Sequence, residues 1–165
     1  MKRKVYLTSA LMLIALTLML LIGVDYFFKK NDTFPFRCST FSRYDLSRKE
    51  GNIFEFAVTQ DLRFQDEKTG YLLLNGQAIA GDTTTILDRR IILSSGNKID
   101  NDTYRYTISN TITSSTDTTP DTLFNKLLAE LTLDHSYLQL SVDKVDDKSY
   151  LIGAPLSYLF TCQRY

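Results

Sequence analysis

The chain has 165 residues, 12% of them aromatic, and its 19 basic residues balance 19 acidic ones. Beyond Lys30 there are 14 Lys and Arg against 18 Asp and Glu, so this part is mildly acidic, near −4. Such a surface offers no basic footprint for nucleic acid, and we expect no direct DNA binding. Two cysteines and one histidine are too few for a zinc site.

The first 24 residues have the pattern of a membrane anchor. Residues 1–4 are Met-Lys-Arg-Lys, and the apolar run from Val5 to Val24 carries no charge. At about 1.5 Å of helical rise per residue, this run is about as long as a hydrocarbon core is thick. No Ala-x-Ala cleavage pattern follows it, so the sequence predicts an uncleaved transmembrane helix over 5–24. A cleaved signal peptide is the alternative.

Basic residues beside the span predict its orientation. Their concentration in residues 1–4 favours a cytoplasmic N-terminus, which places the rest of the chain outside the cytoplasm. The aromatic residues 26–28 fit the belt at the outer interface. We expect residues 25–51 to form a juxtamembrane segment and linker, irregular from residue 31, and residues 52–165 to form an exported β-rich domain.

The two cysteines are Cys38 and Cys162. Outside the cytoplasm a structural disulfide is favoured over two buried thiols. Closing a loop on the order of 100 residues would stabilise the fold by roughly 5 kcal/mol in the chain-entropy model. A catalytic thiol is not expected, because the chain has no Cys-x-x-Cys pair and His135 is its one histidine.

Alternating apolar residues separated by turn signals predict about seven short strands. Asn52 to Phe64 alternates clearly, with Gln60 as a polar exception on the apolar face. Asn75-Gly76 lies between two apolar pieces and predicts either a tight hairpin or a bulge. A turn is expected over 97–102. The other expected strands cover 71–74, 77–80, 84–93, 104–112, 137–145 and 149–162, the last as one or two strands.

One amphipathic helix is predicted after the fifth of these segments. Thr119 is suited to be its N-cap, Pro120 its first residue, and Thr132 its end. Leucines at every fourth position of 123–131 form its core-facing stripe. Because short turns favour an antiparallel meander, the sequence predicts a mainly β (α+β) fold, a small antiparallel barrel or curved sheet covered by this helix.

No catalytic constellation stands out, and we expect neither an enzyme nor a cofactor. His135 is interpreted as a polar turn residue. Asp143, Asp146 and Asp147 could suggest calcium, but the EF-hand pattern is missing, so a solvated turn is expected. Arg89 and Arg90 should point to opposite faces of a strand, so at most one could face a partner.

Four tyrosines are candidates for lining an apolar ligand cavity inside a small barrel: Tyr104, Tyr106, Tyr150 and Tyr158. The alternative is that these are ordinary core and surface residues.

The Lys-rich anchor, the early Phe36-Arg-Cys38 and the closing Tyr158-Leu-Phe-Thr-Cys162 resemble the FidL-like family of bacterial inner-membrane accessory proteins. The resemblance implies a single-pass inner-membrane protein with a lipocalin-like periplasmic domain. Its implied partner is a ToxR-like membrane-bound transcription regulator, PsaE-like, in a heterodimer that controls virulence or fimbrial genes. Only Cys38 and Cys162 are carried over as family-like positions.

The resemblance therefore implies that the exported domain binds the regulator's periplasmic domain and stabilises or tunes it. Pairing between edge strands of the two chains is a mechanism consistent with the sequence. The alternative is a sensor that binds a small apolar ligand, a bile salt or a lipid, by itself. An envelope hydrolase is disfavoured because no nucleophile–base pair is recognisable.

Overall fold

The computed structural model describes residues 12–24, 34–47, 53–155 and 157–165. Residues 12–24 are helical. The predicted cytoplasmic residues 1–4 lie outside the described part, as does the first part of the predicted span over 5–24. Within the described part, no helix has both the length and the apolar character needed to cross a membrane.

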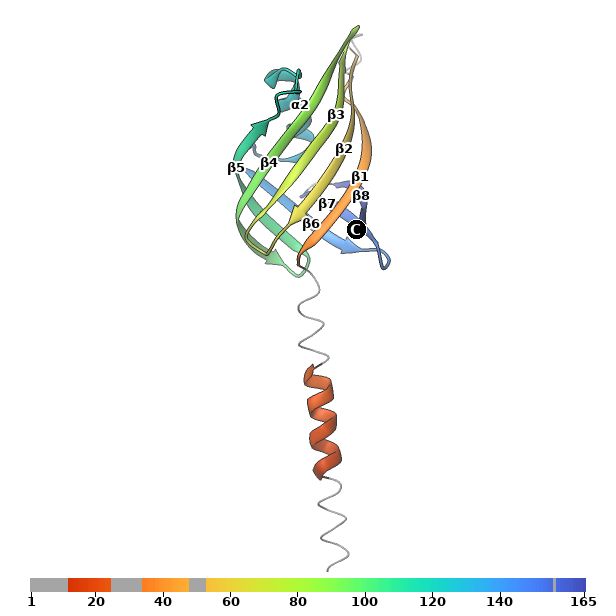
Figure 1. The fold of residues 1–165 in the computed structure, drawn as a ribbon, viewed down its shortest axis with the longest axis vertical. Coiled ribbons are helices and arrows are strands. Elements are labelled where there is room, and N and C mark those ends of the chain that lie inside the picture. The colour runs from red at the N-terminus through yellow and green to blue at the C-terminus, as the bar shows by residue number, and fades with distance from the viewer. Residues whose placement is uncertain (1–11, 25–33, 48–52, 156) are drawn as a thin grey trace, which may run out of the picture. The chain divides into compact units, whose positions relative to one another are not determined.

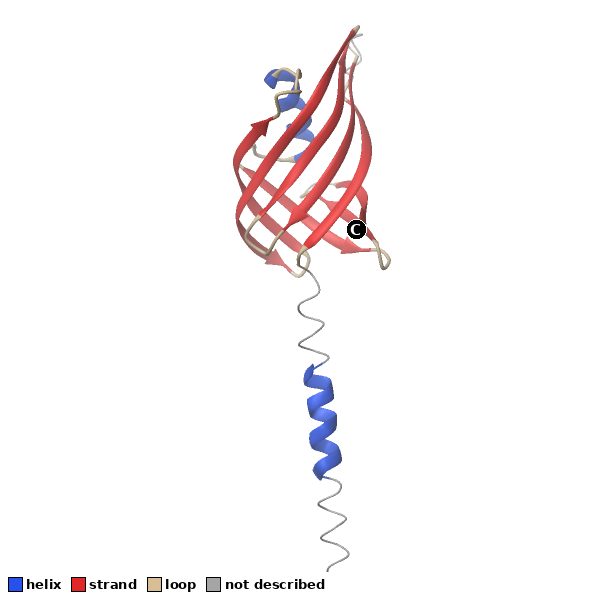
Figure 2. Cartoon of the chain, viewed as in Figure 1, coloured by secondary structure: helices blue, strands red, loops and turns tan. Residues whose placement is uncertain are grey.

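Contacts divide the chain into two units, Met1–Phe34 and Pro35–Tyr165. The second unit is a closed barrel of eight antiparallel strands in sequence order, with helix α2 between β5 and β6 (Figures 1 and 2). This confirms the prediction of a mainly β antiparallel barrel. The elements are β1 Phe36–Asp45, β2 Phe54–Phe64, β3 Gly70–Ala80, β4 Thr83–Asp100, β5 Thr103–Thr113, α2 Asp121–Leu131, β6 Tyr137–Lys144, β7 Ser149–Gly153 and β8 Tyr158–Arg164.

Strand β1 corrects the sequence analysis. The predicted irregular stretch over 31–51 is wrong for Phe36–Asp45, which pairs with β2 along its whole length. Phe36 and Cys38 are buried, but the later inward positions of β1 carry hydroxyl groups. The apolar alternation therefore fades, and pairing with β2 rather than local pattern makes this segment a strand. Residues 31–33 and 48–51 lie outside the described part.

The prediction of a hairpin or bulge at Asn75-Gly76 is also wrong. Strand β3 passes through both residues with unbroken register to β2 and β4. A Cβ on Gly76 would overlap the carbonyl oxygen of Ala57 in β2. The glycine therefore permits a close approach of two backbones within a continuous strand.

Replacing Gly76 with alanine should lower the free energy of unfolding by about 1–3 kcal/mol, because β2 must shift to admit the new Cβ. The neighbouring exposed Asn75→Ala change should cost less than about 1 kcal/mol. The chain lacks tryptophan, so urea unfolding of the full chain in detergent can be followed by tyrosine fluorescence. Equal midpoints for the two variants would contradict the close-approach explanation.

Strand β4 is longer than the expected 84–93 and continues to Asp100. Its register with β5 shifts at three places, and Ser95 has a φ of 52°. Such irregularities admit extra polar residues into a strand and increase its twist. The turn expected over 97–102 is therefore reduced to Asn101 and Asp102.

Helix α2 begins one residue later than predicted. Pro120 is its N-cap, with no side-chain capping bond, and Thr132 is its C-cap as expected. Thr119 does not cap the helix, because its Oγ1 donates to the carbonyl oxygen of Ile86 at 2.8 Å. The predicted core-facing stripe is confirmed, since its buried residues are Leu123, Phe124, Leu127, Leu128 and Leu131.

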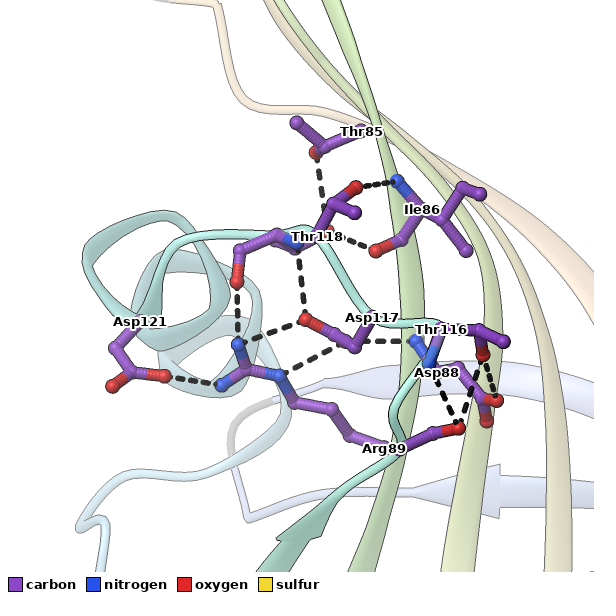
Figure 3. Close-up of polar contacts among 10 residues, drawn as sticks. Thr85, Ile86, Asp88, Arg89, Thr116, Asp117, Thr118 and Asp121 are labelled. Atoms are coloured by element: carbon purple, nitrogen blue, oxygen red, sulfur yellow. Dashed lines mark hydrogen bonds and ion pairs between the residues drawn. The ribbon is translucent and has the colours of Figure 1, made fainter.

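A buried ion pair fastens the start of α2 to β4 (Figure 3). The Arg89 guanidinium donates to the carboxylates of Asp117 at 3.1 Å and Asp121 at 2.7 Å. Only 4% of the Arg89 side chain and 2% of the Asp117 side chain are exposed. Burial alone would lower the pKa of Arg89, but hydrogen bonds to these carboxylates outweigh it, so the pKa is raised and the charge is kept.

Arg89 also lies over the ring of Phe124 in α2, 4.4 Å from its centroid. Arg90 is exposed on the outer face of the barrel, near Tyr71. The prediction that these two arginines face opposite sides is confirmed. Arg89 ties α2 and the segment before it to β4, and Arg90 is the one exposed on the outer face.

Candidate functional site

The seam between β1 and β8 is the weakest closure of the barrel. All ten residues of β1 pair with β2, but the register of β1 with β8 covers only Cys38↔Arg164 and Ser39↔Gln163. In Figure 1, β8 is short and β1 continues far beyond it. Past Ser39 the two strands diverge, so β1 has a free edge among the described residues.

Main-chain groups of β1 face this seam. The Arg37 carbonyl oxygen accepts from the Tyr165 N–H at 3.3 Å, so odd-numbered residues of β1 direct their backbone groups toward β8. The backbone groups of Phe41 and Arg43 therefore point to the same side, where the described residues provide no partner strand. On β8, the Arg164 N–H donates to the Lys148 carbonyl oxygen just before β7, so even-numbered residues of β8 face β7 and the Thr161 backbone faces the seam.

A cleft of about 360 Å³ lies where the strands part. It is lined by residues 39–41 of β1, residues 161–163 of β8 and Ser149 of β7. The Phe41 side chain is 63% exposed at this position. The seam therefore combines unpaired strand edges, hydroxyl groups and an exposed aromatic ring, which together suit an extended polypeptide segment.

The inner wall of the seam is polar. Thr40, Ser42 and Tyr44 occupy the inward positions of β1, and Gln60 of β2 pairs with Thr40. Gln60 is 1% exposed, and its Nε2 donates to the Tyr44 hydroxyl at 2.6 Å. Burial raises the pKa of Tyr44, so its hydroxyl stays protonated. The Gln60 Oε1 is buried without a hydrogen-bond partner among the described residues.

The predicted cysteine pair lies at the closed end of the seam. Cys38 and Cys162 form a disulfide within the chain, with Cα atoms 5.5 Å apart. Both residues are buried. The prediction of a structural disulfide is confirmed, and the bridge joins β1 to β8 beside their two paired positions.

The structure brings together three of the four candidate tyrosines. Tyr104, Tyr106 and Tyr150 are buried, whereas Tyr158 is 67% exposed and does not join them. The Tyr106 ring stacks on Phe64 at 4.7 Å, and the Tyr150 ring meets Phe36 edge-on at 5.0 Å. These rings therefore fill the part of the barrel that they line.

The Tyr106 hydroxyl has no hydrogen-bond partner among the described residues. Burial raises its pKa far above the ordinary tyrosine value, so the group is neutral at physiological pH.

Of the other candidate positions, three lie in turns and one lies on a strand. His135 is exposed in the turn before β6. Asp146 accepts from the N–H groups of Lys148 and Ser149, which lowers its pKa. Asp147 is exposed nearby, and Asp143 lies on β6. Within the described part of the chain, no group of three or more potential metal ligands is found.

Sequence reasoning missed the free edge of β1 but contained one signal for the polar wall. Gln60 interrupts an otherwise apolar face of β2, and the structure places it inside the barrel. A buried amide with an unpaired oxygen is costly, since burying such a group typically costs about 1–3 kcal/mol. The position therefore calls for a hydrogen-bond partner that the described residues do not supply.

The fold and the seam define a small antiparallel β-barrel with one incompletely paired closure. Residues 76–162, more than half of the chain, match the model of the family described as "FidL-like putative membrane protein". The chain therefore belongs to the FidL-like family. The matched segment runs from the middle of β3 into β8 and includes Cys162. No curated protein matches the chain.

Proposed function

We propose that this chain is a non-enzymatic, membrane-anchored regulatory accessory protein. Its barrel binds the periplasmic domain of a ToxR-like transmembrane transcription regulator in a heterodimer and stabilises or tunes it, in control of virulence or fimbrial genes. The observation that carries the proposal is the seam, where Phe41 and Arg43 of β1 and Thr161 of β8 present backbone groups without partners among the described residues. Membership of a family described as membrane proteins supports the membrane location.

In this proposal an extended segment of the regulator adds to the free edge of β1. Backbone hydrogen bonds supply affinity, and side chains that alternate into and out of the barrel supply specificity. The accessory chain acts by favouring one state of the regulator, because a partner shifts an equilibrium only by its differential affinity for the two states. The barrel lies in the periplasm, and residues 1–4 lie in the cytoplasm.

Among accessory proteins of this kind, we propose PsaF of Yersinia as the nearest counterpart and its regulator PsaE as the model for the partner. The alternative, a barrel that senses a bile salt or lipid alone, has less support. Tyr150 packs on Phe36, Tyr106 packs on Phe64 and on Tyr104, and Tyr158 lies outside.

Replacing Phe41 with proline should abolish binding of the regulator while the barrel stays folded. Proline removes the N–H that faces the seam, and edge strands tolerate it where the N–H is unpaired. Phe41→Ala removes the aromatic ring but keeps the N–H, so it should retain most of the binding. The measurement is co-purification in detergent with the regulator, expected as a winged-helix, single-span protein encoded beside this chain, together with the half-life of the regulator in cells.

The regulator should be degraded faster with the Phe41→Pro chain than with the wild type. An unchanged urea midpoint for Phe41→Pro shows that the barrel is intact. If the wild-type chain neither co-purifies with the regulator nor changes its half-life, the proposed function is wrong. If binding persists in the proline variant, the regulator uses another surface.

A further inference from the structure

We infer that the inner wall of the seam is a specificity site for a long hydrogen-bond donor side chain, which the incoming segment of the regulator extends to Gln60 Oε1. The inference rests on the proposed function and adds the chemistry that the seam selects. It is drawn from the polar inner wall of the seam. This observation is separate from the unpaired backbone edge of β1.

Only one of the two polar atoms of the Gln60 amide has a hydrogen-bond partner among the described residues. Its Nε2 bonds to the Tyr44 hydroxyl at 2.6 Å, while its Oε1 is buried without a partner among the described residues. Tyr44 lies four residues beyond Thr40, the residue of β1 that pairs with Gln60. The Gln60 and Tyr44 side chains therefore meet on the inner face of the β1–β2 pair.

The surroundings of this amide differ from the rest of the barrel interior. Leu62 and Leu74, its neighbours on β2 and β3, are buried and apolar. On β1 the inward positions are instead Thr40 and Ser42, both half-buried. The polar inward positions lie next to the unpaired edge of β1. This is where a strand from another chain would complete the interior of the barrel.

The short side chains of Thr40 and Ser42 determine how long a donor side chain must be to reach Gln60. A strand added to β1 lies about 4.8 Å beyond it, so its inward side chains start about 10 Å from the backbone of β2. Threonine and serine are short, which leaves room for a long side chain to pass over β1. Lysine, arginine or glutamine could span this distance and donate to Gln60 Oε1.

The test compares Gln60→Leu and Gln60→Glu in the full chain, with the full-length regulator of the proposed function as the probe. Gln60→Leu should weaken binding about tenfold, because the donor is left buried and unpaired. Gln60→Glu keeps an acceptor and should bind as tightly as the wild type or more tightly. The matched control is Gln77→Leu on the outer face of β3, where the side chain is exposed, and it should not change affinity.

The outcomes separate this inference from the proposed function. If Gln60→Leu binds like the wild type while Phe41→Pro does not bind, the donor site is wrong and the function stands. If Gln60→Leu lowers the urea midpoint of the free chain without changing affinity, Gln60 serves only the fold through its bond to Tyr44, and the inference is overturned. If the wild-type chain does not bind the regulator, both ideas fail together.

Discussion

Replacing Arg89 with methionine should lower the free energy of unfolding of the barrel by about 3–5 kcal/mol. The change leaves the Asp117 carboxylate, whose side chain is 2% exposed, buried without its cation. The loss also releases the start of α2, since the guanidinium joins β4 to Asp121 and to the Thr119 carbonyl (Figure 3). The measurement is urea unfolding of the full chain in detergent, followed by tyrosine fluorescence.

Two further variants separate the buried charge from general damage to β4. Arg90→Met, one residue away on the outer face, should cost less than about 1 kcal/mol, because an exposed cation contributes little. Adding Asp117→Asn to Arg89→Met should recover part of the loss, since the buried charge disappears while one acceptor oxygen stays for either the Asp88 or the Thr119 N–H, which bond to different oxygens of Asp117. Equal losses for Arg89→Met and Arg90→Met would show that the ion pair does not fasten the helix.

The features predicted correctly from the sequence are those encoded locally. Strand β2 alternates over most of its length, and the leucines of α2 recur with helical spacing, so each segment identifies its own buried face. Cys38 and Cys162 are predicted as a pair because the sequence contains no other cysteine. Short turns between strands then favour antiparallel neighbours, which is the observed order.

The features missed from the sequence depend on contacts between distant segments. Strand β1 has polar inward positions, and only its pairing with β2 shows that it is a strand. Gly76 resembles a turn residue until Ala57 of β2 is placed against it. The free edge of β1 exists because β8 diverges from it, and no local pattern encodes this divergence. The candidate site was therefore unpredictable, although Gln60 marked one of its residues.

The two ends of the seam between β1 and β8 differ in how firmly they are held. At one end, the disulfide and two paired positions hold β1 to β8. Beyond Ser39, the same strands separate around the cleft and the polar wall. The bridge therefore limits how far the seam can open, which is what the proposed entry of a regulator segment requires if the barrel is to stay folded.

Replacing both Cys38 and Cys162 with serine should lower the free energy of unfolding by about 2–5 kcal/mol. The bridge closes a loop with a sequence separation of 124 residues, which restricts the unfolded chain strongly. In the folded state it also reinforces a strand pair with only two registered positions. Amide hydrogen exchange should therefore accelerate most in β1 and β8, and least in β2 and β3, which pair along their full length.

A reducing agent provides the matched comparison. It should lower the urea midpoint of the wild-type chain toward that of the double serine variant and leave the variant unchanged. Because both sulfurs are buried, reduction should require partial unfolding and proceed faster as urea is added. If the double variant matches the wild-type midpoint and exchanges no faster in β1 and β8, then the two paired positions alone close the barrel, and the disulfide does not limit the seam.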